Sequence, residues 1–412
     1  MLTYFLFYFL YLLKNELFSQ NKLLIKNKID MIYDNLKTNP NVITKLQPTI
    51  NVNFVEGAFV EIKHGEPGKE YKIEMMHDDQ LHYTCMLKTD MWARSGLKYY
   101  KNWTIKVYND DVLIYTHKQN FKGKRVFISL ESKSLGDTLA WFPYAEEFRK
   151  KHDCELVVCT HLNELFKENY PEIEFVEPGV TVHNLYALYR IGWFYDENSQ
   201  WKKSANPSDF KSIPLQQASS DILGIEYSEI RPKLKLNNKK TKKVGIGIHS
   251  TCQAKYWNNP EGWQEVVLYL KELGYEVMLY SKENDGYMGN FQPKGIEKFR
   301  GGTLQEVIDD LSTCEFFIGL GSGLSWLAWA CDLPIVLISG FSKPFSETTT
   351  KTYRVFNEKV CNGCFNSHRL DASDWNWCPI NKGTEKQFEC TKQISHKMVI
   401  EKINDLIKGL SV

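Results

Sequence analysis

The sequence predicts an α/β fold in which two Rossmann-like halves face a cleft and a small all-β domain precedes them. Three observations predict it. Short alternating strand patterns fill residues 51–122, whereas alternating strand and helix patterns fill 123–240 and again 241–412. A polar, lysine-rich stretch at residues 236–243 lies between the two α/β series and indicates an interdomain linker.

The first of these segments contains short runs of alternating apolar and polar residues and no helical period of useful length. We expect strands at residues 53–55, 58–62, 71–75 and 103–108. Turn-forming residues separate these runs. The segment is therefore predicted to be a small sandwich or barrel.

Both later segments repeat strand and helix patterns. In the first series we expect strands at 125–130, 154–159 and 173–176, and helices at 138–150 and 161–170. In the second series we expect strands at 244–249, 276–280, 316–319 and 334–338, and helices at 262–273, 303–311, 324–331 and 396–410. Such repeats predict parallel sheets covered by helices on both faces.

The composition excludes several classes of protein. The formal charge is only +1 over 412 residues, so the basic surface of a nucleic-acid-binding protein is absent. Residues 2–13 form an apolar run, but Lys14 ends it well short of the ~20 residues that span a bilayer. For residues 1–50 we expect a poorly defined leader, either a helix that packs on a partner or an over-extended start with Met31 as the true beginning. An interfacial anchor is the alternative, and we expect no membrane partner and a cytoplasmic location.

Asp137 stands where a predicted strand passes into a helix. The run Ser134-Leu135-Gly136-Asp137 follows the strand at 125–130 and precedes the helix at 138–150. In a doubly wound sheet this end of a strand opens onto the ligand crevice. Asp137 therefore has two interpretations, as the N-cap of the helix or as a general base that faces the cleft.

A glycine-rich turn in the second α/β series predicts a phosphate site. Residues 319–326 read Gly-Leu-Gly-Ser-Gly-Leu-Ser-Trp between a strand and a helix. Free amide groups and the helix dipole at such a turn attract a diphosphate. The spacing fits neither the dinucleotide fingerprint nor a P-loop. The candidate donor-binding residues here are Gly321, Ser322, Gly323, Leu324 and Ser325.

The loop at residues 249–257 supplies a second candidate for phosphate binding. It follows the first strand of the second series, so its polar residues face the same cleft. Lys255 in this loop offers a point charge for a phosphate oxygen. The alternative is a solvated surface lysine.

The ten cysteines are divided between scattered positions and one C-terminal cluster. The cluster comprises Cys361, Cys364, Cys378 and Cys390 within the loop 361–390. Four thiolates can bind one tetrahedral metal ion, and with all four positions filled the ion would be structural. The spacing allows iron and zinc equally, and free thiols or a redox pair are the alternatives.

These motifs together carry a resemblance. The tandem halves have the architecture of GT-B glycosyltransferases. Ser-Leu-Gly-Asp at 134–137, Lys-Tyr-Trp at 255–257 and Gly-Ser-Gly-Leu-Ser at 321–325 resemble the ADP-heptose-dependent heptosyltransferases. With the four cysteines, the chain after about residue 51 is similar to the bacterial autotransporter heptosyltransferases. Lipopolysaccharide heptosyltransferases usually have Asp-Thr-Gly where this chain has Gly321-Ser322-Gly323, a change that removes a carboxylate near the donor.

The resemblance implies a function for each motif. It implies transfer of heptose from ADP-heptose to serine hydroxyls in the passenger domain of an autotransporter adhesin, with Asp137 as the base. It implies that Lys255 and the loop 321–325 bind the donor diphosphate. It also implies a structural iron and a homo-oligomer. The alternatives are a glycosyltransferase that uses another nucleotide sugar on a glycan acceptor, and a non-catalytic metal-bound scaffold.

Overall fold

The computed structural model describes residues 47–237 and 239–410, which form two compact units. The first unit contains the described residues up to Asn53 with Ala58–Ser95 and Trp103–Lys118, and the second contains Phe54–Gly57, Gly96–Asn102 and the described residues from Gln119 onward. Our expectations for residues 1–46 lie outside the described part of the chain. Within the described ranges, no helix combines the length and the apolar character needed to cross a bilayer. The domain boundaries at residues 50, 122 and 240 stay predictions.

The first unit is made of antiparallel strands, as the alternating patterns predicted. Its strands are β1 (Thr49–Val55, up to Asn53 in this unit), β2 (Phe59–Lys63), β3 (Glu70–His77), β4 (Gln80–Lys88), β5 (Trp92–Arg94), β6 (Trp103–Asn109) and β7 (Val112–Lys118). One sheet has the order β4-β3-β6-β7, and β2 pairs with both β1 and β5. Strands β4 and β7 were not predicted, because most of their side chains are exposed and the alternation is weak.

The first α/β half of the second unit has a parallel sheet with the order β10-β9-β8-β11. Its elements are β8 (Arg125–Leu130), α3 (Leu135–His152), β9 (Glu155–Cys159), β10 (Glu174–Val176), β11 (Ala187–Ile191) and α4 (Leu215–Leu223). At the end of β1, Phe54 and Val55 pair with β11 in the parallel sense. Neither β11 nor α4 was predicted.

The helix predicted at residues 161–170 is wrong. Two 3₁₀ turns stand there, η1 (Asn163–Leu165) and η2 (Lys167–Asn169). Oδ1 of Asn163 accepts hydrogen bonds from the backbone N–H and the hydroxyl of Thr160, and Nδ2 donates to the carbonyl of Val176. The Asn163 side chain therefore competes with helical backbone bonding and ties this segment to the end of β10.

The second α/β half has a six-stranded parallel sheet with the order β14-β13-β12-β15-β16-β17. Its strands are β12 (Lys243–Gly247), β13 (Glu276–Leu279), β14 (Glu297–Lys298), β15 (Phe316–Leu320), β16 (Ile335–Ile338) and β17 (Thr352–Val355). Its helices are α5 (Gly262–Glu272), α6 (Leu304–Leu311), α7 (Gly323–Ala330), α8 (Glu389–Lys392) and α9 (His396–Leu410), and its 3₁₀ turns are η3 (Gln253–Lys255), η4 (Tyr287–Gly289), η5 (Pro344–Ser346) and η6 (Cys364–Asn366). Lys243, which we placed in the linker, begins β12.

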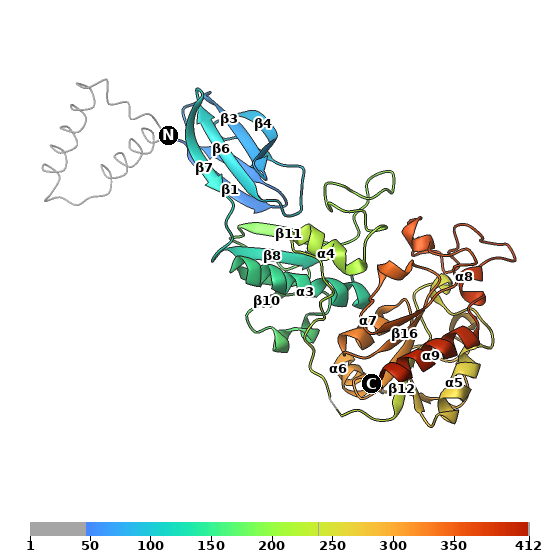
Figure 1. The fold of residues 1–412 in the computed structure, drawn as a ribbon. Coiled ribbons are helices and arrows are strands. Elements are labelled where there is room, and N and C mark those ends of the chain that lie inside the picture. Colours follow the sequence, from blue (N-terminus) through green and yellow to red (C-terminus); the bar gives the residue numbers. More distant parts are fainter. Residues whose placement is uncertain (1–46, 238, 411–412) are drawn as a thin grey trace, which may run out of the picture. The chain divides into compact units, whose positions relative to one another are not determined.

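The core of this half lies between the sheet and the helices α5 and α9. Strand β12 after Lys243 and strand β15 have continuous apolar runs because both of their faces are covered. Figure 1 shows α9 beside α5, and α7 beside α3 where the two halves meet. The predicted fold class, two Rossmann-like halves of GT-B type preceded by a small all-β domain, is confirmed.

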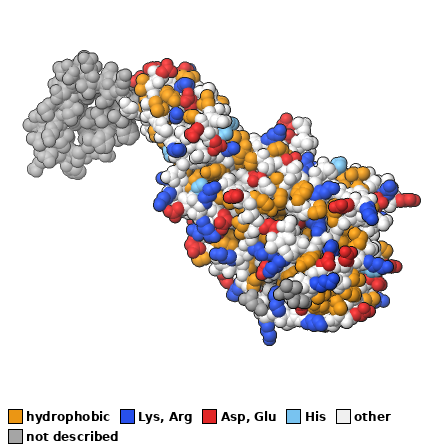
Figure 2. Space-filling model, viewed as in Figure 1, with side chains coloured by type: hydrophobic (Ala, Val, Ile, Leu, Met, Phe, Trp, Pro, Cys, Tyr) orange, Lys and Arg blue, Asp and Glu red, His pale blue; other side chains and the backbone are white. Residues whose placement is uncertain are grey.

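Charges are mixed on the surface of the second unit. On the face shown in Figure 2, acidic and basic side chains are interspersed rather than gathered by sign. The mixture agrees with the formal charge of +1.

Candidate active site

Asp137 lies in the first turn of α3, but it does not cap the helix. The N-cap is Ser134, whose Oγ accepts a hydrogen bond from the Asp137 N–H at 3.4 Å. The backbone N–H of Ser134 donates to Oγ of Ser132 at 3.1 Å. Because two serines satisfy the groups at this helix end, the N-cap interpretation of Asp137 was wrong and its carboxylate is left for other contacts.

The carboxylate of Asp137 is held at one oxygen. Oδ2 accepts hydrogen bonds from Oγ of Ser132 at 2.6 Å and from the indole Nε1 of Trp193 at 2.9 Å. In the described part of the chain, Oδ1 has no hydrogen-bond partner, and the residue keeps part of its surface open to solvent. Burial raises the pKa of Asp137 above its ordinary value, while the two hydrogen bonds and the charge of Lys255 lower it.

The first turns of α3 and α7 touch, and two glycines allow it. A Cβ on Gly136 would lie 3.0 Å from the Trp326 side chain and 3.5 Å from the Cα of Gly323. A Cβ on Gly323 would lie 3.1 Å from the Cβ of Leu135. This close approach joins the two halves at the helix ends, so Asp137 lies beside the glycine-rich turn of the second half.

The glycine-rich turn leaves several polar groups free. Ser322 is the N-cap of α7, but its side chain makes no capping hydrogen bond. In the described residues the amides of Gly323 and Leu324 have no acceptor, whereas the Ser325 amide donates to the Ser322 carbonyl. The Ser325 hydroxyl donates to the Leu320 carbonyl at 2.6 Å. Ser325 therefore supports the turn, and the amides before it are available to a ligand.

Three buried polar atoms without partners lie on loops that follow two neighbouring strands. They are Nε2 of His249 and Oγ of Ser250, both after β12, and Oγ of Ser322 after β15, all unpaired within the described residues. Gly247 and Gly319 are partners in the register of β12 and β15, so both loops start from the same edge of the sheet. Burial lowers the pKa of His249 to about 4, which keeps the ring neutral near pH 7. Buried unpaired groups of this kind favour a polar ligand.

Lys255 ends η3 and faces the same region. Its Nζ lies 5.0 Å from the centroid of the Phe341 ring, and its charge lowers the pKa of Asp137 in the other half. Within the described residues it has no ion pair with a carboxylate. Its charge is therefore free to meet an anion.

A carboxylate approaches the glycine-rich turn from the loop after η5. A Cβ on Gly321 would lie 2.5 Å from Oε1 of Glu347. The Ser342 hydroxyl donates to the carboxylate of Glu347, at 2.8 Å from Oε1 and 2.9 Å from Oε2, and Glu347 also forms an ion pair with Arg354 in β17. The absence of a side chain at position 321 therefore makes room for a carboxylate that comes from elsewhere in the chain.

The four C-terminal cysteines lie near one another and all are free thiols. Burial, followed by the charges of the other three cysteines, raises the pKa of Cys390 to about 12. Cys364 and Cys378 belong to one apolar cluster with Phe341, Trp377 and Phe388, and Cys361 packs against it. Among the described residues, no group of three or more His, Cys, Asp or Glu side chains is arranged to hold a metal ion. The set of donor atoms suits a thiophilic cation, because such an ion would offset the repulsion between neighbouring thiolates.

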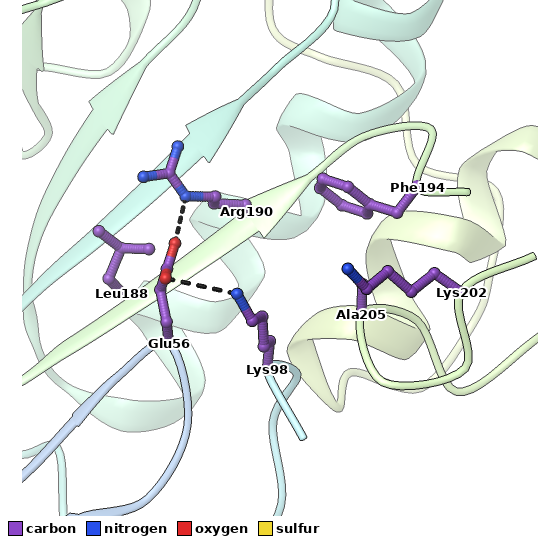
Figure 3. A pocket seen from close by; sticks show the side chains of 7 residues that line it. All are labelled: Glu56, Lys98, Leu188, Arg190, Phe194, Lys202 and Ala205. Carbon is purple, nitrogen blue, oxygen red and sulfur yellow. Dashed lines mark hydrogen bonds and ion pairs between the residues drawn. The ribbon is translucent and has the colours of Figure 1, made fainter. Parts of the chain in front are cut away.

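A separate small pocket lies next to β11 (Figure 3). Glu56 is drawn between Arg190 and Lys98, at 2.6 Å from Nε of the arginine and 3.5 Å from Nζ of the lysine. Phe194 and Lys202 line it as well. Its volume of about 70 Å³ is far below the ~300 Å³ or more of ordinary ligand sites, so it is too small for a nucleotide sugar.

Three residues of this region were not singled out from the sequence: Ser132, Trp193 and Glu347. Ser132 carried a signal, since it lies in the short loop between a strand and Asp137, where a serine can bond to the carboxylate. Trp193 and Glu347 carried none, because their partners are distant in the sequence.

Comparison with known proteins finds relatives of this chain. Residues 208–372 match glycosyltransferase family 9 (heptosyltransferase). The autotransporter heptosyltransferase Aah of Escherichia coli is 38% identical over 87% of this chain and 95% of its own length. The autotransporter heptosyltransferase TibC of Escherichia coli O78:H11 is 38% identical over 91% of this chain and 94% of its own length.

A solved structure gives the same result. The crystal structure of TibC, described as a dodecameric iron-containing heptosyltransferase in complex with ADP-D-beta-D-heptose, matches with a TM-score of 0.80 and 36% identity. The match covers 89% of this chain and 99% of the TibC chain. The sequence identity, the coverage and the shared fold show that the chain belongs to the autotransporter heptosyltransferase family and is a glycosyltransferase.

Proposed function

We propose that the protein transfers heptose from ADP-heptose to serine hydroxyls in the passenger domain of an autotransporter adhesin, in the cytoplasm. The observation that carries the proposal is the contact between Gly136 and Gly323. It brings the carboxylate of Asp137 beside a helix end with free amides. A base next to a diphosphate site is the arrangement that glycosyl transfer to a hydroxyl requires.

Asp137 acts as the general base. The serine oxygen forms a bond to the anomeric carbon, the bond from that carbon to the diphosphate oxygen breaks, and the serine proton passes to Asp137. Oδ1 is the acceptor of this proton, because Oδ2 is occupied by Ser132 and Trp193. Burial raises the pKa of Asp137, which makes it a stronger base once it is ionised.

The glycine-rich turn and Lys255 stabilise the departing ADP. The amides of Gly323 and Leu324 are free to donate to phosphate oxygens, and the α7 dipole adds to their effect. Lys255 supplies a full positive charge across the site. Gly321 lets the ligand and Glu347 approach the turn, and the unpaired hydroxyl of Ser322 offers a further donor. Fixed donors of this kind act on the charge that develops on the leaving group.

Cys361, Cys364, Cys378 and Cys390 hold one structural metal ion, which links the ends of the loop 361–390. TibC, which contains iron, supports iron as the ion, while the donor set also suits zinc. The protein forms a homo-oligomer, as the dodecameric TibC supports.

Mass spectrometry of an adhesin passenger fragment, after incubation with ADP-heptose and the purified protein, tests the proposal. We expect a mass increase of one heptose per modified serine, and no increase with Asp137→Asn. Calorimetry with ADP-heptose and other nucleotide sugars tests the donor separately. If another nucleotide sugar binds more tightly and is transferred instead, the donor assignment is wrong.

A further inference from the structure

The four-cysteine loop contacts the segment that follows β11 in the other half. The rings of Phe365 and Trp193 meet edge to face, with centroids 5.7 Å apart and planes at 88°. Nδ2 of Asn366 donates to the Lys211 carbonyl at 2.8 Å. The guanidinium of Arg369 stacks on a tyrosine of this segment at 4.1 Å. The loop therefore reaches across to the half that carries the candidate base.

Trp193 is the residue on which these contacts converge. Three rings surround its indole: Trp141 of α3 at 5.6 Å, Phe210 at 5.0 Å and Phe365 of the cysteine loop at 5.7 Å. The first two belong to the same half, and Phe365 is the contribution of the other half. The indole N–H enclosed in this way is the one that donates to Oδ2 of Asp137 at 2.9 Å.

The same loop also lies behind Lys255. Phe365 packs on Phe341 with ring centroids 5.3 Å apart, and the Phe341 ring carries Nζ of Lys255 at 5.0 Å. Phe365 follows Cys364 directly in the sequence. Phe341 thus supports Phe365 from its own half, and Lys255 lies over the Phe341 ring rather than over Phe365.

We propose that Phe365 and Trp193 are positioning residues, through which the cysteine loop fixes the carboxylate of Asp137 in the geometry needed for proton transfer. The proposal rests on the proposed function, since it assumes that Asp137 is the base. Edge-to-face packing of Phe365 limits the tilt of the indole. A fixed indole keeps its N–H directed at Oδ2 and leaves Oδ1 turned toward the acceptor hydroxyl.

A purely structural role for the two rings would have a different consequence. Rings that only hold the halves together would change stability when altered and leave the base unchanged. A positioning role also changes the protonation of Asp137, because the indole N–H stabilises the carboxylate. Among the described residues, the other titratable groups that interact with Asp137 are Lys255 and Tyr195. Neither is altered in the variants below.

The test compares Trp193→Phe, Phe365→Leu and the double variant in the full-length protein. For each we would measure kcat, the KM for ADP-heptose, the pH profile of kcat and the bound metal by elemental analysis. Trp193→Phe removes the N–H and keeps a ring. We expect both single variants to lower kcat by roughly 10-fold or more with little change in KM. We also expect the acid limb of the profile to move to higher pH, and the double variant to add nothing to Trp193→Phe.

Phe388→Leu is the matched control. Phe388 belongs to the same apolar cluster as the cysteines, and in the described part of the chain its ring has no contact with Trp193. Phe388→Leu should lose about as much stability as Phe365→Leu, but its pH profile of kcat should match that of the wild type. The proposal is overturned if Phe365→Leu behaves like Phe388→Leu, or if its effects add to those of Trp193→Phe. Turnover by Asp137→Asn would show that Asp137 is not the base. Failure of the proposed function can therefore be distinguished from failure of the positioning proposal.

Discussion

The hydroxyl of Ser132 lies 2.6 Å from Oδ2 of Asp137 and also accepts the backbone N–H of Ser134. An acidic residue in the first helical turn often turns back to bond the amide of the N-cap residue. Here Oγ of Ser132 accepts the hydrogen bond from the Ser134 amide instead, and the Ser132 hydroxyl donates a hydrogen bond to the carboxylate. One serine thus satisfies the helix end and leaves Oδ1 of Asp137 free.

Replacement of this serine should change the titration of the base. Ser132→Ala removes a donor that stabilises the charged carboxylate, so the pKa of Asp137 should rise further. The base works in its ionised form, and the acid limb of the kcat profile should therefore move to higher pH. Measurement of kcat for heptose transfer between pH 5 and 9 checks this.

Ser134→Ala is the control for Ser132→Ala. It removes the N-cap side chain of α3 and should cost about 1 kcal/mol of stability, but it leaves both donors to Oδ2 in place. Its acid limb should match that of the wild type. Equal shifts in the two variants would mean that disorder of the helix end, and not the lost hydrogen bond, changes the base.

Asp137→Asn should raise thermal stability while it abolishes transfer. Burial raises the folded-state pKa of Asp137 above its unfolded value, so the ionised carboxylate costs stability at neutral pH. The neutral amide removes this cost and can still accept from Ser132 and Trp193. The stability advantage should be largest near pH 7 and should narrow as the pH falls and the wild-type carboxylate becomes protonated. Melting temperatures across this range, with heptose transfer assayed in parallel, check both effects.

The surface variant Asp405→Asn serves as its control. Asp405 pairs with Lys402 on the exposed side of α9, where ion pairs contribute little. Its melting temperature should stay close to the wild-type value at every pH. If Asp137→Asn is less stable than the wild type at pH 7, then the hydrogen bonds to Oδ2 outweigh the cost of burial.

Gly321→Ala should weaken donor binding because the new methyl group collides with a fixed carboxylate. The added Cβ would lie 2.5 Å from Oε1 of Glu347, which Ser342 and Arg354 hold in place. Overpacking of this kind costs about 1–3 kcal/mol, equivalent to roughly 10-fold or more in affinity if the turn is displaced. Calorimetry with ADP measures the loss.

Two further variants separate the collision from other effects of an alanine. A Cβ on Gly96 meets nothing within 4 Å, so Gly96→Ala should bind ADP like the wild type. In a Glu347→Ala background the methyl group at position 321 meets no carboxylate, and its added cost should shrink. If Gly321→Ala weakens ADP binding equally in the wild type and in the Glu347→Ala variant, then the collision is not with Glu347.

The sequence predicts the parts of this fold that local pattern controls. The apolar runs at 244–249 and 316–319 correspond to β12 and β15 because strands covered on both faces are continuously apolar. The prediction of a helix at 161–170 was wrong because the side chain of Asn163 accepts hydrogen bonds from Thr160 and so competes with the backbone bonding of a helix. Strand β11 was missed although its apolar residues are buried, since a five-residue strand without clear turn signals carries a weak pattern.

The candidate site divides in the same way. Asp137 follows a strand of the first α/β half, and Lys255 and the glycine-rich turn follow two strands of the second half. In each parallel sheet such positions meet at the edge where the strands end. The hydrogen bond between Trp193 and Asp137 and the approach of Glu347 to Gly321 depend on how distant loops fold over that edge. No periodicity records such contacts, so only the three-dimensional structure reveals them.

Cys364→Ser should lose the bound ion and melt at a lower temperature, because the variant lacks one of the four thiolate ligands and the loop 361–390 then loses its cross-link. Cys85→Ser changes a cysteine of β4 in the first unit and should keep both the ion and the melting temperature. Elemental analysis and thermal melting of the wild type and both variants measure these effects. Wild-type protein without a stoichiometric ion would rule out the metal site. A Cys364→Ser variant that loses the ion but keeps its melting temperature would show instead that apolar packing around Phe341 and Trp377 holds the loop.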